Sequence, residues 1–395
     1  MRNVVDQLDK VQIGGGGQST EVKNREKWKS NAQRVATPDA AEGRTAPVSF
    51  VVMSKELRIN RRIRVFLSLL IVVFLCQPLG ASAAYDHVSN RPGAFIVSKN
   101  KGHMNTNSSI RDVVSHPSFE GFGQFVLPLD NRAYDENMQL RRVGSLLPYH
   151  SHVEPEAVVD TINYMIDQVA EGKIIFYNFY TERQKQENPA KRNTGLFFFK
   201  GKPGAPFAIV CPGGGFSYVG SVHEGFPHAT QLSKKGYNAF VLQYRVGGER
   251  VACEDLATAI SYIFKHAGSL GVSTKDYSVW GSSAGARMAA QIGSYGPAGY
   301  GSYDLPRPRV VVMAYTGHSS FTRNDPPTFV VQGENDGIVN VSTVDRRVDA
   351  MRNAGIEVEY HKYRNVSHGF GLGIGTDAEG WTVYAVKFWE KHISE

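Results

Sequence analysis

The chain has 395 residues, of which 42% are hydrophobic and 21% are charged. This composition excludes wholesale disorder, collagen and coiled coil, and the length fits one large domain with an appendage. The net charge of +7 comes mostly from residues 1–83, with 13 Lys and Arg against 7 Asp and Glu; the other 312 residues carry 31 against 30. Nucleic-acid binding needs clustered positive charge on the folded body, so we expect no nucleic-acid partner.

The N-terminal residues fall into two parts. Residues 1–52 contain a run of four glycines and little apolar periodicity, and we interpret them as a disordered extension. After Met53, five Lys and Arg residues precede an apolar run over 65–76, and Ala81-Ser82-Ala83 follows. This pattern over residues 53–83 is typical of a secretory signal peptide with cleavage near Ala83. It predicts a secreted or periplasmic protein, and it suggests that Met53 is the true start and that residues 1–52 are a mis-assigned extension.

No stable membrane span is expected after signal cleavage, because the uninterrupted apolar run is shorter than the roughly 20 residues that cross a bilayer. Only two cysteines, Cys211 and Cys253, lie beyond the leader, which allows one disulfide but no disulfide framework.

The next predicted parts are an N-terminal accessory segment, 84–153, and a main domain, 154–395. The accessory segment is polar with scattered aromatic residues, and we assign no element to it. A helix is predicted from Pro155 to Gly172, because apolar residues recur on one face and proline suits a first turn. Two strands are then expected, at 173–181 and 195–200.

Strands and helices alternate from residue 207 onward. The predicted strands are 207–211, 239–244, 277–280, 310–314, 328–331 and 358–363, and the predicted helices are 253–267, 284–292, 343–353 and 381–392. Such alternation predicts an α/β fold with a mostly parallel central sheet and helices on both faces. Sites in these folds lie beyond the carboxyl ends of the strands.

A Gly-x-Ser-x-Gly motif, Gly281-Ser282-Ser283-Ala284-Gly285, stands between the strand ending at 280 and the helix beginning at 284. In this motif the serine occupies a strained turn, and the glycines let neighbouring backbone approach closely. The following helix N-terminus favours negative charge. The context favours Ser283 as a nucleophile over a purely structural turn.

A serine nucleophile needs a base and an acid, and both follow in the order Asp, then His. Asp336 comes just after the strand 328–331, and His368 just after the strand 358–363, so both are expected on the same rim as Ser283. Taken alone, Asp336 could be a turn aspartate and His368 a loop histidine. Their joint placement after the two strands favours a catalytic triad with Ser283. Glu334 is the alternative acid, although a solvated loop carboxylate is favoured.

A glycine-rich loop, Pro212-Gly213-Gly214-Gly215-Phe216, follows the strand 207–211. Consecutive glycines let backbone N–H groups face a ligand, which predicts an oxyanion hole formed by Gly214, Gly215 and Ala284. The alternative is a flexible turn. Phosphate binding is excluded, because the Walker lysine and the Gly-x-Gly-x-x-Gly spacing are absent.

Three further residues leave alternatives open. His223 and Glu224 follow the glycine loop, where a structural role is favoured over a place at the pocket edge. Arg245 either pairs with a buried carboxylate under the oxyanion loop or is a solvated charge at a strand end.

These motifs resemble the α/β-hydrolase superfamily in its acetyl-esterase and feruloyl-esterase-like (BD-FAE-like) branch. The resemblance covers about 173–392 and rests on the residues 211–216, 236–245, 281–285, 333–336 and 367–370. It implies the α/β-hydrolase fold and a Ser-His-Asp serine esterase. Proline at position 212, where lipases usually carry histidine, is similar to the carbohydrate-esterase relatives.

The sequence thus predicts a secreted serine hydrolase that cleaves carboxylic esters. We expect a short-acyl, acetyl esterase acting on small or glycan esters, with no metal and no cofactor. The alternatives are a serine peptidase of the same fold and a catalytically silent binding protein.

Overall fold

The computed structural model describes residues 102–394. The predicted extension and signal peptide lie outside the described residues. Among residues 102–394, no helix combines the length and apolar character needed to cross a membrane. Cys211 and Cys253 are both buried and both free, so the disulfide that the sequence allowed is not formed.

Eight strands form one sheet in the order β1-β2-β4-β3-β5-β6-β7-β8. The pairs β1·β2 and β2·β4 are antiparallel, and all other pairs are parallel. The strands are β1 (Phe176–Tyr177), β2 (Gly195–Phe199), β3 (Pro206–Cys211), β4 (Asn238–Gln243), β5 (Ser273–Ser282), β6 (Val310–Ala314), β7 (Thr328–Gly333) and β8 (Val358–Tyr363). This is the mostly parallel sheet of the α/β hydrolases, which confirms the predicted fold class.

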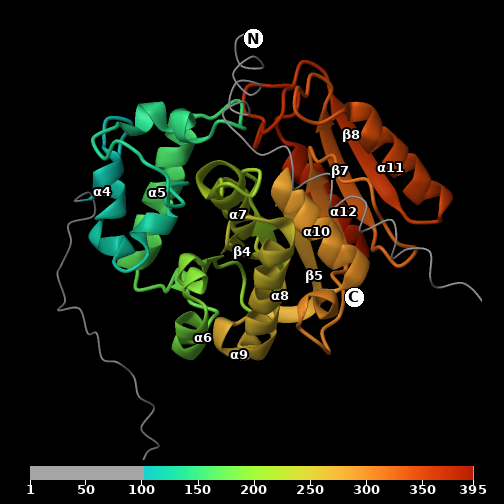
Figure 1. Ribbon diagram of the computed structural model, residues 1–395, viewed down its shortest axis with the longest axis horizontal. Helices are drawn as coiled ribbons and strands as arrows, with labels where there is room; N and C mark the ends of the chain where they lie inside the picture. The colour runs from blue at the N-terminus through green and yellow to red at the C-terminus, as the bar shows by residue number, and fades with distance from the viewer. Residues whose placement is uncertain (1–101, 395) are drawn as a thin grey trace, which may run out of the picture. The chain divides into compact units, whose positions relative to one another are not determined.

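Helices cover both faces of the sheet. Alternate strand residues point to opposite sides, and both sides carry buried apolar residues. In β3, Ala208 and Val210 belong to one buried cluster, while Phe207 and Ile209 belong to the other. The first face is covered by α5 (Pro155–Ala170), α7 (Phe226–Lys234) and α12 (Trp381–His392), and the second by α8 (Glu249–Lys265), α10 (Ala284–Tyr295) and α11 (Val341–Asn353). Figure 1 shows α5 beside α7, and α11 beside β8.

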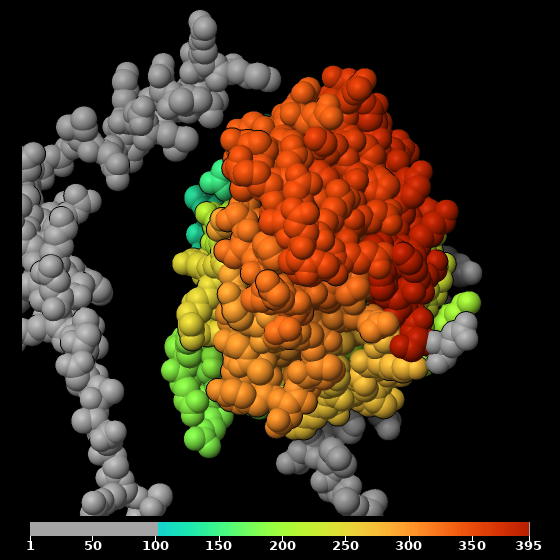
Figure 2. Space-filling view, turned by 90° about the vertical axis from the view of Figure 1, so that its right-hand side faces the viewer, coloured from blue at the N-terminus to red at the C-terminus, as the bar shows by residue number. Residues whose placement is uncertain are grey.

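The remaining elements are short. They are α4 (Ile110–Val114), α6 (Glu182–Glu187), α9 (Ala267–Leu270), a π-helical turn over Ser221–Gly225, and 3₁₀ turns over Pro117–Phe119, Gly123–Phe125, Leu140–Leu146, Pro189–Asn193 and Pro297–Tyr300. The C-terminal part of the chain, coloured orange to red, forms most of the molecular surface seen in Figure 2.

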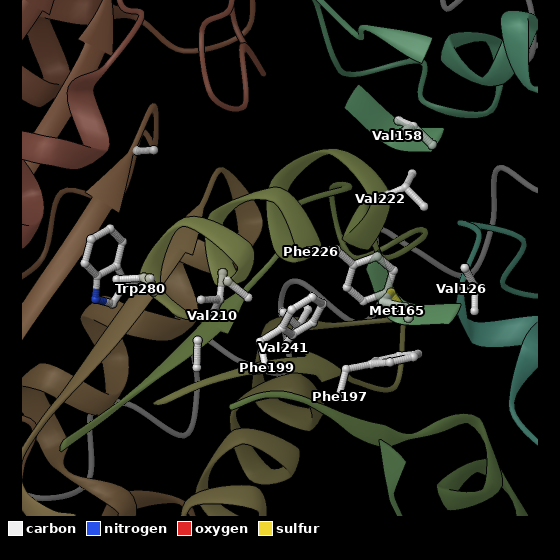
Figure 3. Close-up of a cluster of buried hydrophobic side chains, with 14 of the residues drawn as sticks. Val126, Val158, Met165, Phe197, Phe199, Val210, Val222, Phe226, Val241 and Trp280 are labelled. Carbon is white, nitrogen blue, oxygen red and sulfur yellow. The ribbon is translucent and has the colours of Figure 1, made fainter. Parts of the chain in front are cut away.

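The described part of the accessory segment, 102–153, packs into the core of the main domain. Val126 is fully buried in the same cluster as Phe197 and Phe226 of the sheet and α7 (Figure 3). Ile110 and Leu140 are also fully buried in that cluster. Residues 102–153 therefore share one hydrophobic core with the main domain.

Candidate active site

Ser283 occupies the sharp turn between β5 and α10. Its backbone has φ 50° and ψ −114°, a region that non-glycine residues rarely adopt and that costs on the order of 1–3 kcal/mol. Two flanking glycines make the turn sterically allowed. A Cβ on Gly281 would lie 2.2 Å from the Gly285 carbonyl oxygen, and one on Gly285 would lie 1.9 Å from the Cys211 carbonyl oxygen.

His368 and Asp336 complete a hydrogen-bonded chain with this serine. Ser283 Oγ lies 2.8 Å from His368 Nε2, and His368 Nδ1 lies 2.8 Å from Asp336 Oδ2. Asp336 follows β7 and His368 follows β8, so all three residues stand at the carboxyl edge of the sheet, as their positions after predicted strands implied. The His368 side chain is only 4% exposed, and that of Asp336 is fully buried.

Asp336 is held as a carboxylate by four donors. Its Oδ1 accepts from the backbone N–H groups of Ile338 and Val339, at 2.9 and 2.7 Å, and its Oδ2 accepts from Gln332 Nε2 at 2.8 Å besides His368. Burial alone would raise the pKa of Asp336, but the hydrogen bonds and the charge of His368 lower it below its ordinary value. Glu334, the alternative acid, is exposed.

The glycine loop after β3 lies directly against Ser283. A Cβ on Gly213 would be 2.8 Å from Ser283 Cβ. Within residues 102–394, the backbone N–H groups of Gly214, Gly215 and Ala284 donate no hydrogen bond to another group of the chain. Ala284 is the first residue of α10, where N–H groups have no partner inside the helix. These three amides are therefore available to a ligand next to Ser283.

The amide of Gly213, in the same loop, is instead engaged by a buried carboxylate. Gly213 N donates to Glu224 Oε2 at 2.5 Å, and Tyr315 Oη donates to Glu224 Oε1 at 2.7 Å. His150 Nε2 lies 3.1 Å from the same Oε1, and both the His150 and Glu224 side chains are at most 1% exposed. Burial would raise the pKa of Glu224, but its interaction with His150 and its other hydrogen bonds lower the pKa to about 2.

The stretch 149–151 of the accessory segment contacts both the glycine loop and the loop that carries His368. Tyr149 is 43% exposed and stacks on Tyr218 with ring centroids 5.7 Å apart, and a Cβ on Gly215 would be 3.1 Å from its ring. On the histidine side, Ser151 Oγ donates to the His368 carbonyl oxygen at 2.7 Å, and Ser151 N donates to that of Gly369 at 3.0 Å.

Sequence reasoning missed these contributions. His150 and Ser151 lie outside the segment that resembles a known family, and Tyr315 carries no motif. Only Glu224 had been singled out, with a structural role favoured. A buried polar cluster of residues so far apart in the chain leaves no periodic signal in the sequence.

Arg245 is not a solvated charge at a strand end, because its side chain is only 9% exposed. Its guanidinium donates to Asp255 Oδ1 at 2.7 and 2.9 Å, and Tyr180 Oη donates to the same oxygen at 2.6 Å. The partner is thus a buried carboxylate, as one alternative supposed, but it belongs to α8. The carboxylate under the glycine loop is Glu224. Among residues 102–394, no group of three or more His, Cys, Asp or Glu side chains could hold a metal ion.

Comparison with known proteins adds three findings. The BD-FAE family model matches residues 199–298, which contain the glycine loop and Ser283. The chain is 24% identical over 207 residues to an acetylxylan esterase of Xylanibacter ruminicola, covering 45% of this chain and 43% of that protein. It is 25% identical over 216 residues to an endo-1,4-beta-xylanase B of Butyrivibrio fibrisolvens, covering 44% and 34%.

The chain thus spans less than half the length of these curated relatives. Among solved structures, an acetyl ester-xyloside bifunctional hydrolase from Caldicellulosiruptor lactoaceticus is similar, with a TM-score of 0.45 and 22% identity over 50% of this chain and 88% of that one. Residues 199–298 thus match the BD-FAE family model, within a chain whose central sheet has the α/β-hydrolase arrangement.

Proposed function

We propose that this protein hydrolyses carboxylic esters, with Ser283 as nucleophile, His368 as general base and Asp336 as the residue that orients the histidine. The observation that carries the proposal is the pair of 2.8 Å contacts that link Ser283 to His368 and His368 to Asp336. A serine hydrogen-bonded to a histidine that is in turn hydrogen-bonded to a buried carboxylate performs acyl transfer on unrelated folds.

In the first half-reaction, Ser283 Oγ attacks the ester carbonyl carbon while His368 Nε2 takes the serine proton. The carbonyl oxygen becomes an oxyanion, for which the free N–H groups of Gly214, Gly215 and Ala284 are the available donors. The carbon–oxygen bond to the alcohol then breaks, and His368 returns the proton to the departing alcohol. An acyl group remains on Ser283.

In the second half-reaction, a water molecule attacks the acyl carbonyl carbon while His368 Nε2 accepts a proton from the water. The bond to Ser283 Oγ breaks, the serine regains its proton, and the carboxylic acid leaves. Asp336 stays ionised throughout, because its two backbone donors and Gln332 stabilise the carboxylate. It holds Nδ1 protonated, so that Nε2 is free to act as the base.

The proposed substrate is a short-acyl ester, with acetyl groups on a carbohydrate as the specific proposal. Two observations support this choice: the similarity to the acetylxylan esterase and the match of residues 199–298 to the BD-FAE family. The half-exposed Tyr149 ring beside the glycine loop offers a stacking surface to a sugar.

A peptidase of the same fold is less well supported. Such enzymes commonly add a large propeller domain that grips the peptide, and all strands in residues 102–394 belong to the single sheet. We also propose that the protein is exported, on the strength of the signal-peptide pattern over residues 53–83. N-terminal sequencing of exported material tests cleavage near Ala83, and a mature chain that retains residues 14–17 would contradict that cleavage. Absence of the protein from exported material would contradict export itself.

The activity is tested with C2 to C4 p-nitrophenyl esters, acetylated xylan, feruloyl sugars and a prolyl p-nitroanilide at matched concentration. The expected result is hydrolysis of the acetyl esters, together with fluorophosphonate labelling that is lost in Ser283→Ala. Faster cleavage of the prolyl amide than of any short ester would support a peptidase. Neither turnover nor labelling would support a silent binding protein.

A further inference from the structure

The glycine loop is held in place by the buried carboxylate of Glu224, which is not part of the Ser283-His368-Asp336 triad. Glu224 has no exposed surface, and its two oxygens contact Gly213 N, Tyr315 Oη and His150 Nε2. A buried carboxylate that loses a partner is strongly destabilised, so these contacts hold each other in place. Because Gly213 immediately precedes the two glycines with free amides, its anchoring fixes where those amides point.

His150 is itself fixed at its other nitrogen. Its Nδ1 lies 2.9 Å from Tyr218 Oη, and Tyr218 Oη also accepts from Tyr149 N at 3.1 Å. The imidazole packs against Gly220, where a Cβ would lie 2.9 Å from Nε2. These contacts hold the imidazole with Nε2 3.1 Å from Glu224 Oε1, an ion-pair distance at which the N–H does not point along a hydrogen bond.

We propose that His150 and Glu224 are positioning residues of the oxyanion hole, and that the stretch 149–151 of the N-terminal segment is an integral part of the active site. Ser151 extends the same stretch to the opposite loop, where it holds the backbone of His368 and Gly369. Three consecutive residues thus connect the loop that would receive the oxyanion with the loop that carries the base. The proposal rests on the proposed esterase function.

This arrangement predicts a specific kinetic effect. The oxyanion forms in the transition state, so a displaced amide lowers kcat more than it raises KM. Complete removal of one oxyanion donor typically lowers kcat by about 10²- to 10³-fold. A donor that is displaced but still present should cost less, about 10- to 100-fold.

The test compares two substitutions of one residue. His150→Gln keeps a donor near the Nε2 position that faces Glu224, whereas His150→Asn keeps one only near Nδ1. The substrates are p-nitrophenyl acetate and p-nitrophenyl thionoacetate, in which sulfur replaces the carbonyl oxygen. Sulfur accepts hydrogen bonds poorly, so a damaged oxyanion hole slows the oxygen ester more than the sulfur ester.

We expect His150→Asn to lower kcat for the oxygen ester about 10- to 100-fold and to lower the oxygen-to-sulfur rate ratio at least several-fold. His150→Gln should stay closer to the wild type. Ser151→Ala should slow both esters by the same factor, because it acts on the His368 loop. His116→Asn, a change of the same kind elsewhere in the accessory segment, should leave both rates unchanged.

Hydrogen exchange gives a second readout that does not depend on activity. The Gly213 amide, which is hydrogen-bonded to Glu224, should exchange faster in His150→Asn than in the wild type or in His116→Asn. An unchanged oxygen-to-sulfur rate ratio in His150→Asn, whether or not both esters are slowed, or unchanged exchange at Gly213, would overturn the positioning role. If the wild type hydrolyses neither ester but exchange still responds to His150→Asn, the positioning role stands and the esterase proposal fails.

Discussion

The substitution Asp336→Asn tests how the carboxylate sets the proton position on His368. Asp336 accepts four hydrogen bonds, two at each oxygen, from Ile338 N, Val339 N, Gln332 Nε2 and His368 Nδ1. An asparagine has only one acceptor oxygen. If that oxygen keeps the two backbone donors, its NH₂ group faces the two side-chain donors.

The contact with His368 is then satisfied only if Nδ1 gives up its proton and accepts a hydrogen bond from the asparagine. The proton moves to Nε2, the nitrogen that must be free to take the proton of Ser283. A histidine in the wrong tautomer lowers kcat by about 10⁴-fold in a Ser-His-Asp enzyme. At 1.36 kcal/mol per factor of ten, this is about 5 kcal/mol of lost transition-state stabilisation.

The assay is kcat for p-nitrophenyl acetate, with circular dichroism to show that the variant is folded. The matched control is Glu334→Gln, which makes the same chemical change on an exposed carboxylate two residues away and should leave kcat within about twofold. A folded Asp336→Asn protein that keeps more than a tenth of wild-type kcat would refute the assignment of Asp336 as the orienting acid.

Three further changes test the fold around the site. Gly285→Ala should prevent normal folding or strongly lower the unfolding temperature, because the new Cβ would lie 1.9 Å from the Cys211 carbonyl oxygen; a wild-type melting curve would contradict this. Val126→Ala should lower the free energy of unfolding by about 2 kcal/mol in urea titrations, because it removes two buried carbon groups and leaves a cavity; no change would show that residues 102–153 are not part of the core. The pKa of His318 is lowered to about 4, chiefly by burial and then by two arginines, below its ordinary value of 6.5. As the pH falls, His318 therefore becomes protonated in the unfolded chain at a higher pH than in the folded protein. The free energy of unfolding of the wild type should fall by up to about 3 kcal/mol between pH 6.5 and 4, and His318→Gln should reduce that fall. An identical pH dependence of both proteins would argue against it.

The parts of the fold that were predictable are those with strong local patterns. The strands β6 and β8 and the helix α12 have the predicted bounds, because each is a continuous apolar or amphipathic run with clear ends. Strand β5 begins at Ser273, earlier than predicted. Its first residues are polar and show no apolar strand pattern, and Ser273 belongs to the strand because it pairs with Pro206 of β3.

Helix α7 and the elements before residue 154 were missed. Helix α7 has nine residues of mixed polarity, although Phe226, Ala229 and Leu232 are buried at helical spacing and Pro227 stands in its first turn. In α4, the capping box of Ser109 and Asp112 was a readable start signal. The other turns in this segment are 3₁₀, which carry too few residues to show a period.

The residues proposed for catalysis were predictable because each follows a strand in a recognisable motif. The buried contacts among His150, Glu224 and Tyr315 were not predictable. The contact between His150 and Glu224 joins residues 74 positions apart, and that between Tyr315 and Glu224 joins residues 91 apart. Only the folded sheet brings these loops together, so the sequence alone shows a histidine, a glutamate and a tyrosine without a relation between them.

The central claim is that Ser283 carries the acyl group during turnover. It is tested most directly by acid-quenching the protein during hydrolysis of p-nitrophenyl acetate and mapping the acetyl adduct by peptide mass spectrometry. The account predicts one adduct, on the peptide that contains Ser283, which accumulates in a burst and is absent in Ser283→Ala together with the activity. An adduct on another residue, or a Ser283→Ala protein that still hydrolyses the ester at the wild-type rate, would contradict it.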